Sequence, residues 1–198
     1  MNLVERRRSF PGPRDEPPPP PPVDRATFER WAERQEGRYE WVRGEIVMMV
    51  QVTRGHADIL ANVLIALAAV IDRTVYQVSA AEFGVETKAG IRYPDLVVDR
   101  RTGNRRERSA KAPLFIAEVL SPSNESVDLV EKADEYTAIE SLGTYAVFSP
   151  DEPRVRVWQR KEAGFAEVPE TIEGMDARLD IPVLDVSLPL ADVYRNLD

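Results

Sequence analysis

The clearest pattern in the chain is a run of apolar residues spaced three and four positions apart between Gly55 and Ile71. This spacing places them on one face of a helix and predicts that the helix packs against a core. A second, shorter helix is predicted after Asp24, whose side chain can cap it, with Thr27 as an alternative cap. The apolar residues of the long helix are Ile59, Leu60, Val63, Leu64, Leu67 and Ile71.

Alternating and continuous apolar segments predict the strands. Two strands are predicted in residues 39–50 around the turn Arg43-Gly44, and the apolar segment 113–120 is the predicted central strand. A helix is predicted over residues 126–143, with Gly143 as the residue that stops it. Further strands are predicted in residues 74–87, 93–99 and 144–151, an edge hairpin in 154–160 and 164–168, and a short last helix in 188–197.

This order of elements predicts an α/β or α+β fold in which helices flank a mixed central sheet. A chain of 198 residues fits one domain plus tails, and we expect that domain over residues 24–198. Pro17 to Pro22 are consecutive prolines, which favour polyproline II. We therefore expect residues 1–23 to form a disordered or extended arm. It would act as a spacer, or alternatively dock a partner domain that recognises PxxP.

Composition and charge narrow the class of protein. A net charge of −8 argues against coating nucleic acid by bulk electrostatics, but it does not exclude local action on nucleic acid. The absence of cysteine excludes disulfides and Cys-ligated metal sites and fits a reducing cytoplasm. No apolar run is long enough to span a membrane, and the N-terminal residues lack the apolar region of a secretory signal. We expect a soluble cytoplasmic protein.

Basic residues gather in the polar segment between two predicted strands. We expect a solvated loop there, and a contact to nucleic acid is the alternative. The residues are Arg100, Arg101, Arg105, Arg106, Arg108 and Lys111.

Two carboxylates interrupt apolar strands. Glu118 lies within the central strand, and Asp95 follows Tyr93-Pro94 at the start of another. An isolated buried charge is costly, so a partner is expected. If the two strands pair as a hairpin, both carboxylates lie at one end of the sheet, where a divalent cation would relieve their repulsion.

Lys132 is the third candidate. On the predicted helix it shares a face with Leu129, Tyr136 and Ile139. Its ammonium can reach Glu118, or its stem can extend along the helix so that the ammonium lies in water. Spacing alone favours neither arrangement.

Three further residues are weaker candidates for the site. Glu45, beside the turn Arg43-Gly44, is a candidate metal ligand or a surface ion-pair partner, and Glu40 is the nearest alternative to it. His56, the only histidine, lies on the face of Ile59 and Val63 at the start of the long helix. We expect a helix-terminal or core histidine that is bonded locally and is not a metal ligand, because one imidazole alone defines no metal site.

Other kinds of site have little support. The chain contains neither GxxxxGK nor GxGxxG, and no serine lies in a GxSxG elbow. Hydrolysis by paired carboxylates, as in glycosidases, is possible for Asp95 and Glu118 but leaves Lys132 without a role.

Together these residues resemble the PD-(D/E)XK nuclease superfamily and, within it, the Uma-two family of restriction-endonuclease-like proteins. The resemblance runs from about Phe28 to Tyr194. The segments that carry it are YEWVRGEIVMM, GHADILANVLIALAAVI, IRYPDLVV, IAEVLSPSN and EKADEYTAIESLGTYAVFSPD.

The resemblance implies a restriction-endonuclease-like core and a metal-dependent endonuclease that hydrolyses DNA. Asp95, Glu118 and the Val119 carbonyl would bind Mg²⁺ or Mn²⁺, and Glu45 would be a further site residue. The superfamily's lysine position is Leu120 here, so Lys132 on the next helix would assist the attacking water. The alternative is a non-catalytic domain of the same fold that binds a partner. In either case a homodimer or higher homo-oligomer is expected.

Overall fold

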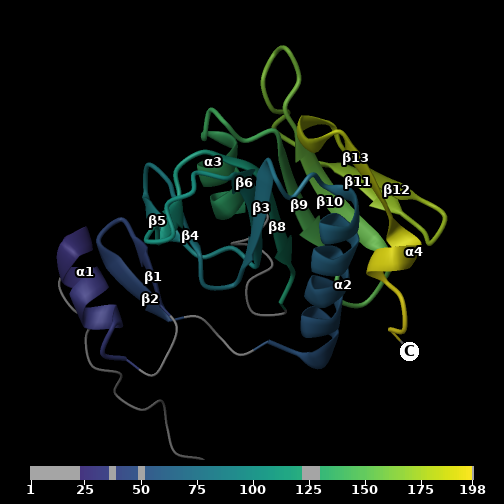
Figure 1. Ribbon diagram of the computed structural model, residues 1–198. Helices are drawn as coiled ribbons and strands as arrows, with labels where there is room; N and C mark the ends of the chain where they lie inside the picture. Colours follow the sequence, from purple (N-terminus) through teal and green to yellow (C-terminus); the bar gives the residue numbers. More distant parts are fainter. Residues whose placement is uncertain (1–22, 36–38, 49–51, 122–129, 198) are drawn as a thin grey trace, which may run out of the picture.

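The computed structural model describes residues 23–35, 39–48, 52–121 and 130–197 (Figure 1). The predicted arm, residues 1–23, lies outside these ranges except for Val23. The helices are α1 (Arg25–Ala32), α2 (Arg54–Val70), α3 (Lys132–Thr137) and α4 (Leu190–Val193), with a 3₁₀ turn, η2 (Pro182–Leu184). None of the helices in the described ranges has the length and apolar content that crossing a membrane requires.

A six-stranded sheet carries the core. Its order is β11-β10-β9-β8-β6-β3, so the predicted central strand, β8, is internal. β8 and β9 are parallel, whereas the other neighbours are antiparallel, which confirms the predicted mixed sheet. The bounds are β3 (Tyr76–Ala80), β6 (Leu96–Arg100), β8 (Pro113–Val119), β9 (Thr144–Phe148), β10 (Arg154–Gln159) and β11 (Glu170–Glu173).

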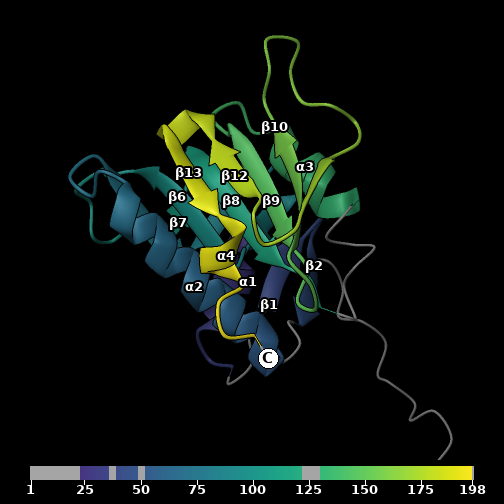
Figure 2. The same cartoon turned by 90° about the vertical axis from the view of Figure 1, so that its right-hand side faces the viewer.

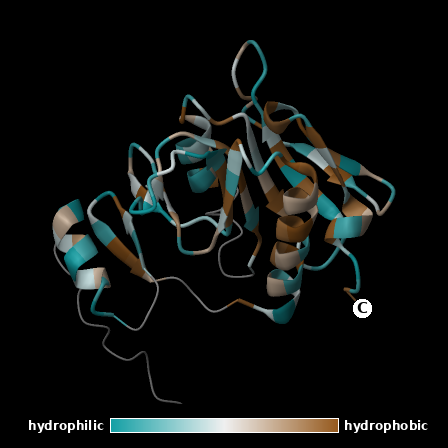
Figure 3. Cartoon of the chain, viewed as in Figure 1, coloured by the Kyte–Doolittle hydropathy of each residue, from teal (hydrophilic) through white to brown (hydrophobic). Residues whose placement is uncertain are grey.

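Different elements cover the two faces of this sheet. α2, α4 and the hairpin of β12 (Arg178–Ile181) and β13 (Val186–Pro189) cover one face (Figure 2). The predicted apolar face of α2 packs there through Ile59, Val63 and Leu67, and Figure 3 shows how apolar this helix is. α3 packs on the opposite face. Alternation along β8 therefore directs Phe115, Ala117 and Val119 toward α2, and Ile116 and Glu118 toward α3.

A second sheet packs beside α3 and has the order β2-β1-β5-β4-β7. The predicted turn at Arg43-Gly44 is confirmed: both residues have positive φ, 52° and 87°, as a two-residue hairpin with the favoured twist requires. α1 begins after Asp24, whose side chain accepts from Thr27 N–H, so this cap is also confirmed. The strands are β1 (Tyr39–Val42), β2 (Glu45–Met48), β4 (Gly84–Glu86), β5 (Gly90–Arg92) and β7 (Ser109–Ala110).

The predicted helix 126–143 is wrong at its C-terminal end. α3 ends at Thr137, and the predicted start, residues 126–129, lies outside the described residues. Gly143 does not cap the helix. A Cβ there would lie 2.5 Å from that of Val183, so glycine is needed for close packing against η2.

The predicted partner of β10 is also wrong, because β10 pairs with Glu170–Glu173 and not with residues 164–168. Phe165 in that segment instead packs beneath the Arg160 guanidinium, 4.5 Å from its ring centroid. The basic residues of the 100–111 segment are all exposed, as expected for a solvated loop.

Asp99, at the opposite end of β6 from Asp95, provides a test of buried charge. Its side chain is buried, and Oδ1 has no hydrogen-bond partner among the described residues. Burial raises the pKa of Asp99, so the folded state binds more protons and stability falls as pH rises above the unfolded pKa. Asp99→Asn is therefore expected to raise the free energy of unfolding at neutral pH by about 1 kcal/mol.

Urea unfolding at pH 7 and at about pH 3 measures this effect. The gain should shrink in acid, where the wild-type carboxyl is protonated in both states. Asp176→Asn, at an exposed position, is the matched control. An equal gain at both pH values would exclude ionisation as the cause.

Candidate active site

The candidate site lies where β6 begins and β8 ends. The two strands are antiparallel with Leu96 opposite Ala117, which brings Asp95 and Glu118 to the same end of the sheet. Asp95 N–H lies 3.4 Å from Glu118 Oε2, and Val119 N–H donates to Asp95 Oδ2 at 2.8 Å. The structure therefore brings the two predicted carboxylates together through the predicted hairpin pairing.

Lys132 joins them from α3. Its Nζ donates to Glu118 Oε1 at 2.9 Å, and the exposed fractions of the two residues are 7% and 3%. The lysine therefore does not extend along the helix into water. Tyr136, one turn later on α3, donates its hydroxyl to the same oxygen at 3.3 Å. Burial raises the pKa of Tyr136 well above its usual value, so the hydroxyl keeps the proton that it donates.

Packing beneath α3 fixes these donors. The Tyr136 ring contacts the Tyr145 ring edge to face, with a distance of 5.1 Å between ring centroids. Tyr145 in turn stacks on Trp158, with a centroid distance of 5.2 Å. Leu120, which directly follows β8, is buried in the same cluster as Ala133 and Tyr136. The leucine at this position thus belongs to the apolar cluster beneath α3. The ammonium that contacts Glu118 comes from Lys132 on α3.

His56 lies at the N-terminal end of α2 and is buried, as expected, but its side chain does not bond locally. Its Nε2 lies 3.2 Å from Asp95 Oδ2, and its ring is buried. Thr53 accepts from His56 N–H at the helix N-terminus, but the side-chain partner is distant in sequence and not local. Nδ1 is buried without a hydrogen-bond partner in the described part of the chain. The sequence feature that could have indicated this contact is that His56 is a polar residue on the apolar face that α2 presents to the sheet.

The surroundings of Asp95 favour its ionised form. Burial by itself raises the pKa of a carboxyl, but the hydrogen bond and charge of His56, the Val119 N–H and the charge of Lys132 outweigh it. The pKa of Asp95 is therefore below its usual value. The anion is held by donors from α2 and β8, with the Lys132 ammonium contributing at longer range.

Glu45 and Glu40 occupy different environments. Glu45 is exposed at the start of β2, and none of the described contacts links it to Asp95 or Glu118. Glu40 is buried, and its Oε1 accepts from Tyr93 N–H at 3.0 Å, two residues before Asp95. Of the two carboxylates, Glu40 is therefore the one that contacts the segment leading into the site.

A buried ion network connects this segment to α3. The Arg92 guanidinium donates to Glu40 at 2.9 Å and to both oxygens of Glu135 at 2.8 and 2.9 Å. Glu135 lies on α3 between Lys132 and Tyr136. Arg92 therefore ties the Tyr93-Pro94-Asp95 turn to the helix that supplies the contacts to Glu118.

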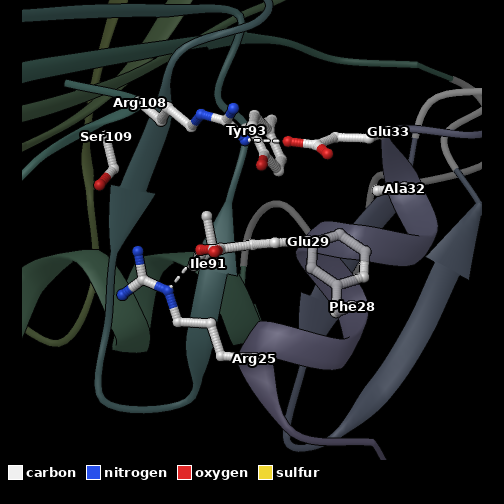
Figure 4. Close-up of a pocket in the computed structure, with 9 residues that line it drawn as sticks. All are labelled: Arg25, Phe28, Glu29, Ala32, Glu33, Ile91, Tyr93, Arg108 and Ser109. Carbon is white, nitrogen blue, oxygen red and sulfur yellow. Dashed lines mark hydrogen bonds and ion pairs between the residues drawn. The ribbon is translucent and has the colours of Figure 1, made fainter. Parts of the chain in front are cut away.

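Tyr93 also lines a small cavity of about 120 Å³ between α1 and the second sheet (Figure 4). Its charged side chains are paired: Arg108 contacts Glu33 at 2.6 Å, and Arg25 contacts Glu29 at 2.8 Å. Arg108 is the one basic residue of the 100–111 segment that lines this cavity, and its charge is already paired with that of Glu33.

The oxygen atoms at the site are of the kind that Mg²⁺ and Mn²⁺ prefer. Asp95 Oδ1 has no hydrogen bond from the described residues, because His56 and Val119 both contact Oδ2. In an extended strand, the N–H and C=O of one residue point to the same side, so the Val119 carbonyl is directed toward Asp95. No group of three or more His, Asp or Glu side chains in the described ranges is arranged to hold a metal. A metal ion at this position would therefore rely on the two carboxylates and the Val119 carbonyl, with water molecules completing its coordination.

The architecture is that of a nuclease-like fold. A crystal structure titled "a putative nuclease belonging to DUF820", from Anabaena variabilis ATCC 29413, superposes with a TM-score of 0.63 at 16% identity. The match covers 81% of this chain and 91% of that chain, which shows the shared fold. The family model of Uma2, described as "Putative restriction endonuclease", matches residues 25–191. The chain belongs to the Uma2 family. No curated protein matches it.

Proposed function

We propose that this protein is a metal-dependent endonuclease that hydrolyses phosphodiester bonds in DNA. The observation that carries the proposal is the meeting of Asp95, Glu118 and Lys132 at one end of the sheet, all nine-tenths or more buried. Family membership and the nuclease fold support the same reaction. Two carboxylates beside an ammonium suit phosphoryl chemistry, in which negative charge must be both held and neutralised.

Each residue has a role in this proposal. Asp95 Oδ1, Glu118 and the Val119 carbonyl would hold Mg²⁺ or Mn²⁺, which supplies charge neutralisation and a bound water of lowered pKa. Lys132, held by Glu118, orients the attacking water or stabilises charge on the leaving oxygen. His56 holds Asp95 Oδ2, so that Oδ1 remains directed to the site. Glu45 stays a predicted site residue that would act from the exposed edge of the second sheet.

Replacing Asp95 with asparagine tests the proposal. Asparagine keeps the shape of the side chain but removes the anion, so plasmid nicking in Mg²⁺ or Mn²⁺ should fall by about 100-fold or more. Loss of the metal-induced rise in Tm should accompany it. Asp151→Asn, at an exposed position after β9, is the matched control.

Two results would count against this assignment. Nicking that persists in EDTA would favour hydrolysis by paired carboxylates without a metal. Absence of cleavage on double-stranded and single-stranded DNA, together with unchanged partner binding in Lys132→Ala, would favour a non-catalytic binding domain.

A further inference from the structure

We propose that the proline segment Pro17–Pro22 docks, within the same molecule, into an aromatic hollow between α1 and the β1–β2 hairpin. The hollow has a volume of about 300 Å³. Its lining residues are Val23, Thr27, Trp31, Tyr39 and Ile46. This interaction is separate from the nuclease proposal and does not depend on it.

Two aromatic side chains line the hollow. Trp31 and Tyr39 contact each other edge to face, with their ring centroids 4.7 Å apart and an angle of 71° between the ring planes. Proline-rich segments in polyproline II conformation are recognised by aromatic-lined grooves of this kind. None of the lining residues is charged, so the walls do not favour a charged ligand.

The position of the proline segment in the chain identifies it as the occupant. The six prolines end immediately before Val23, and Val23 itself lines the hollow. Val23 is held at this rim by both backbone groups: its N–H donates to Gly44 O at 2.8 Å, and its carbonyl accepts from Trp41 Nε1 at 2.9 Å. A polyproline II helix rises about 3.1 Å per residue, so six prolines are long enough to cross the hollow. Direct attachment at the rim makes the effective concentration high.

Docking there would support β1 from the face opposite the candidate site. Tyr39, Trp41 and Ile46 share one face of the hairpin by its register, whereas Glu40 lies on the other face and contacts Tyr93 and Arg92. The half-buried aromatic side chains of the hollow gain apolar contacts when proline rings fill it. The arm thus stabilises the strand that presents Glu40.

Fluorine NMR of the full chain labelled with 5-fluorotryptophan tests this proposal. The chain has three tryptophans, and Trp31→Phe identifies the Trp31 resonance. Replacement of Pro17 to Pro22 by alternating glycine and serine should shift the Trp31 resonance and increase its H₂O/D₂O isotope shift. The buried Trp158 resonance should not move. Replacement of Pro11 and Pro13 by serine is the matched control and should leave Trp31 unchanged.

Three results would contradict the proposal. An unchanged Trp31 resonance in the glycine-serine variant would overturn the proposal. A Trp31 shift in Phe10→Ser without one in the glycine-serine variant would place phenylalanine in the hollow and also overturn it. If the wild-type Trp31 signal changed on dilution, the arm would dock on a second copy of the chain, and the intramolecular assignment would be wrong.

Discussion

For the proposed metal-dependent endonuclease, replacing Lys132 with methionine is expected to lower DNA cleavage strongly and to increase the stabilisation expected from Mg²⁺. Methionine retains an unbranched apolar stem but lacks the ammonium that contacts Glu118 Oε1 at 2.9 Å. If this ammonium positions the attacking water or neutralises charge, cleavage should fall by about 100-fold to 10,000-fold.

The rise in Tm caused by the metal should change in the opposite direction and become larger. In the wild type, one oxygen of Glu118 already has a cationic partner, and a bound metal must share that carboxylate. Without the ammonium, buried Glu118 lacks this compensation, and the metal-free variant should lose about 3–5 kcal/mol of stability. A divalent cation would then restore the missing positive charge. Its effect on Tm should therefore be larger than in the wild type at equal metal concentration.

Thermal unfolding in Mg²⁺ and plasmid nicking, measured on the same preparations, check both halves of this prediction. Lys161→Met, at an exposed position after β10, is the control for loss of a positive charge alone. The double variant Glu118→Gln/Lys132→Met removes both charges and should recover stability without recovering cleavage. Full cleavage by folded Lys132→Met would show that the lysine has only a structural role.

Sequence was sufficient for the parts of the site that depend on local pattern. The apolar face of α2, the continuous apolar run of β8 and the turn at Arg43-Gly44 are each encoded within a few residues. Asp95 and Glu118 meet because β6 and β8 pair antiparallel, and these strands follow each other closely in the chain with only the short β7 between them. The helical spacing of Lys132 and Tyr136 placed both on one face, but only packing showed that the ammonium is buried.

The remaining features depend on contacts between distant segments. Glu40 and Glu45 lie on the same face of one hairpin by its register, and the pairing of β1 with β5 is what brings Glu40 to Arg92. His56 reaches Asp95 only because α2 crosses the sheet near the start of β6. The need for Gly143 depends on η2, which lies far along the chain. No local pattern determines any of these approaches.

Replacing Arg92 with methionine is expected to destabilise the protein by about 3–5 kcal/mol, the range for removing one partner of a buried ion pair. Arg92 has a 3% exposed fraction and is the cation between Glu40 and Glu135. Its removal leaves two buried carboxylates facing a methionine side chain. Their mutual repulsion and the cost of their burial then act against both β1 and α3.

Urea unfolding measures the loss, and the matched control is Arg108→Met. Arg108 also forms a close ion pair, with Glu33 at 2.6 Å, but both side chains are more than half exposed. Such pairs contribute about 0–1 kcal/mol, so this variant should be nearly neutral. Similar losses in the two variants would show that burial of the Arg92 network is not what makes it important.

Neutralising the two acids should rescue the Arg92 variant. In Glu40→Gln/Arg92→Met/Glu135→Gln no buried charge remains in the network, and Gln at position 40 can still accept from Tyr93 N–H through its amide oxygen. We expect most of the lost stability to return, because replacing a whole buried ionic group is far less costly than breaking it. Cleavage should recover less than stability, since Arg92 fixes α3, and therefore Lys132, relative to the turn that carries Asp95. Complete recovery of both would mean that packing alone positions α3.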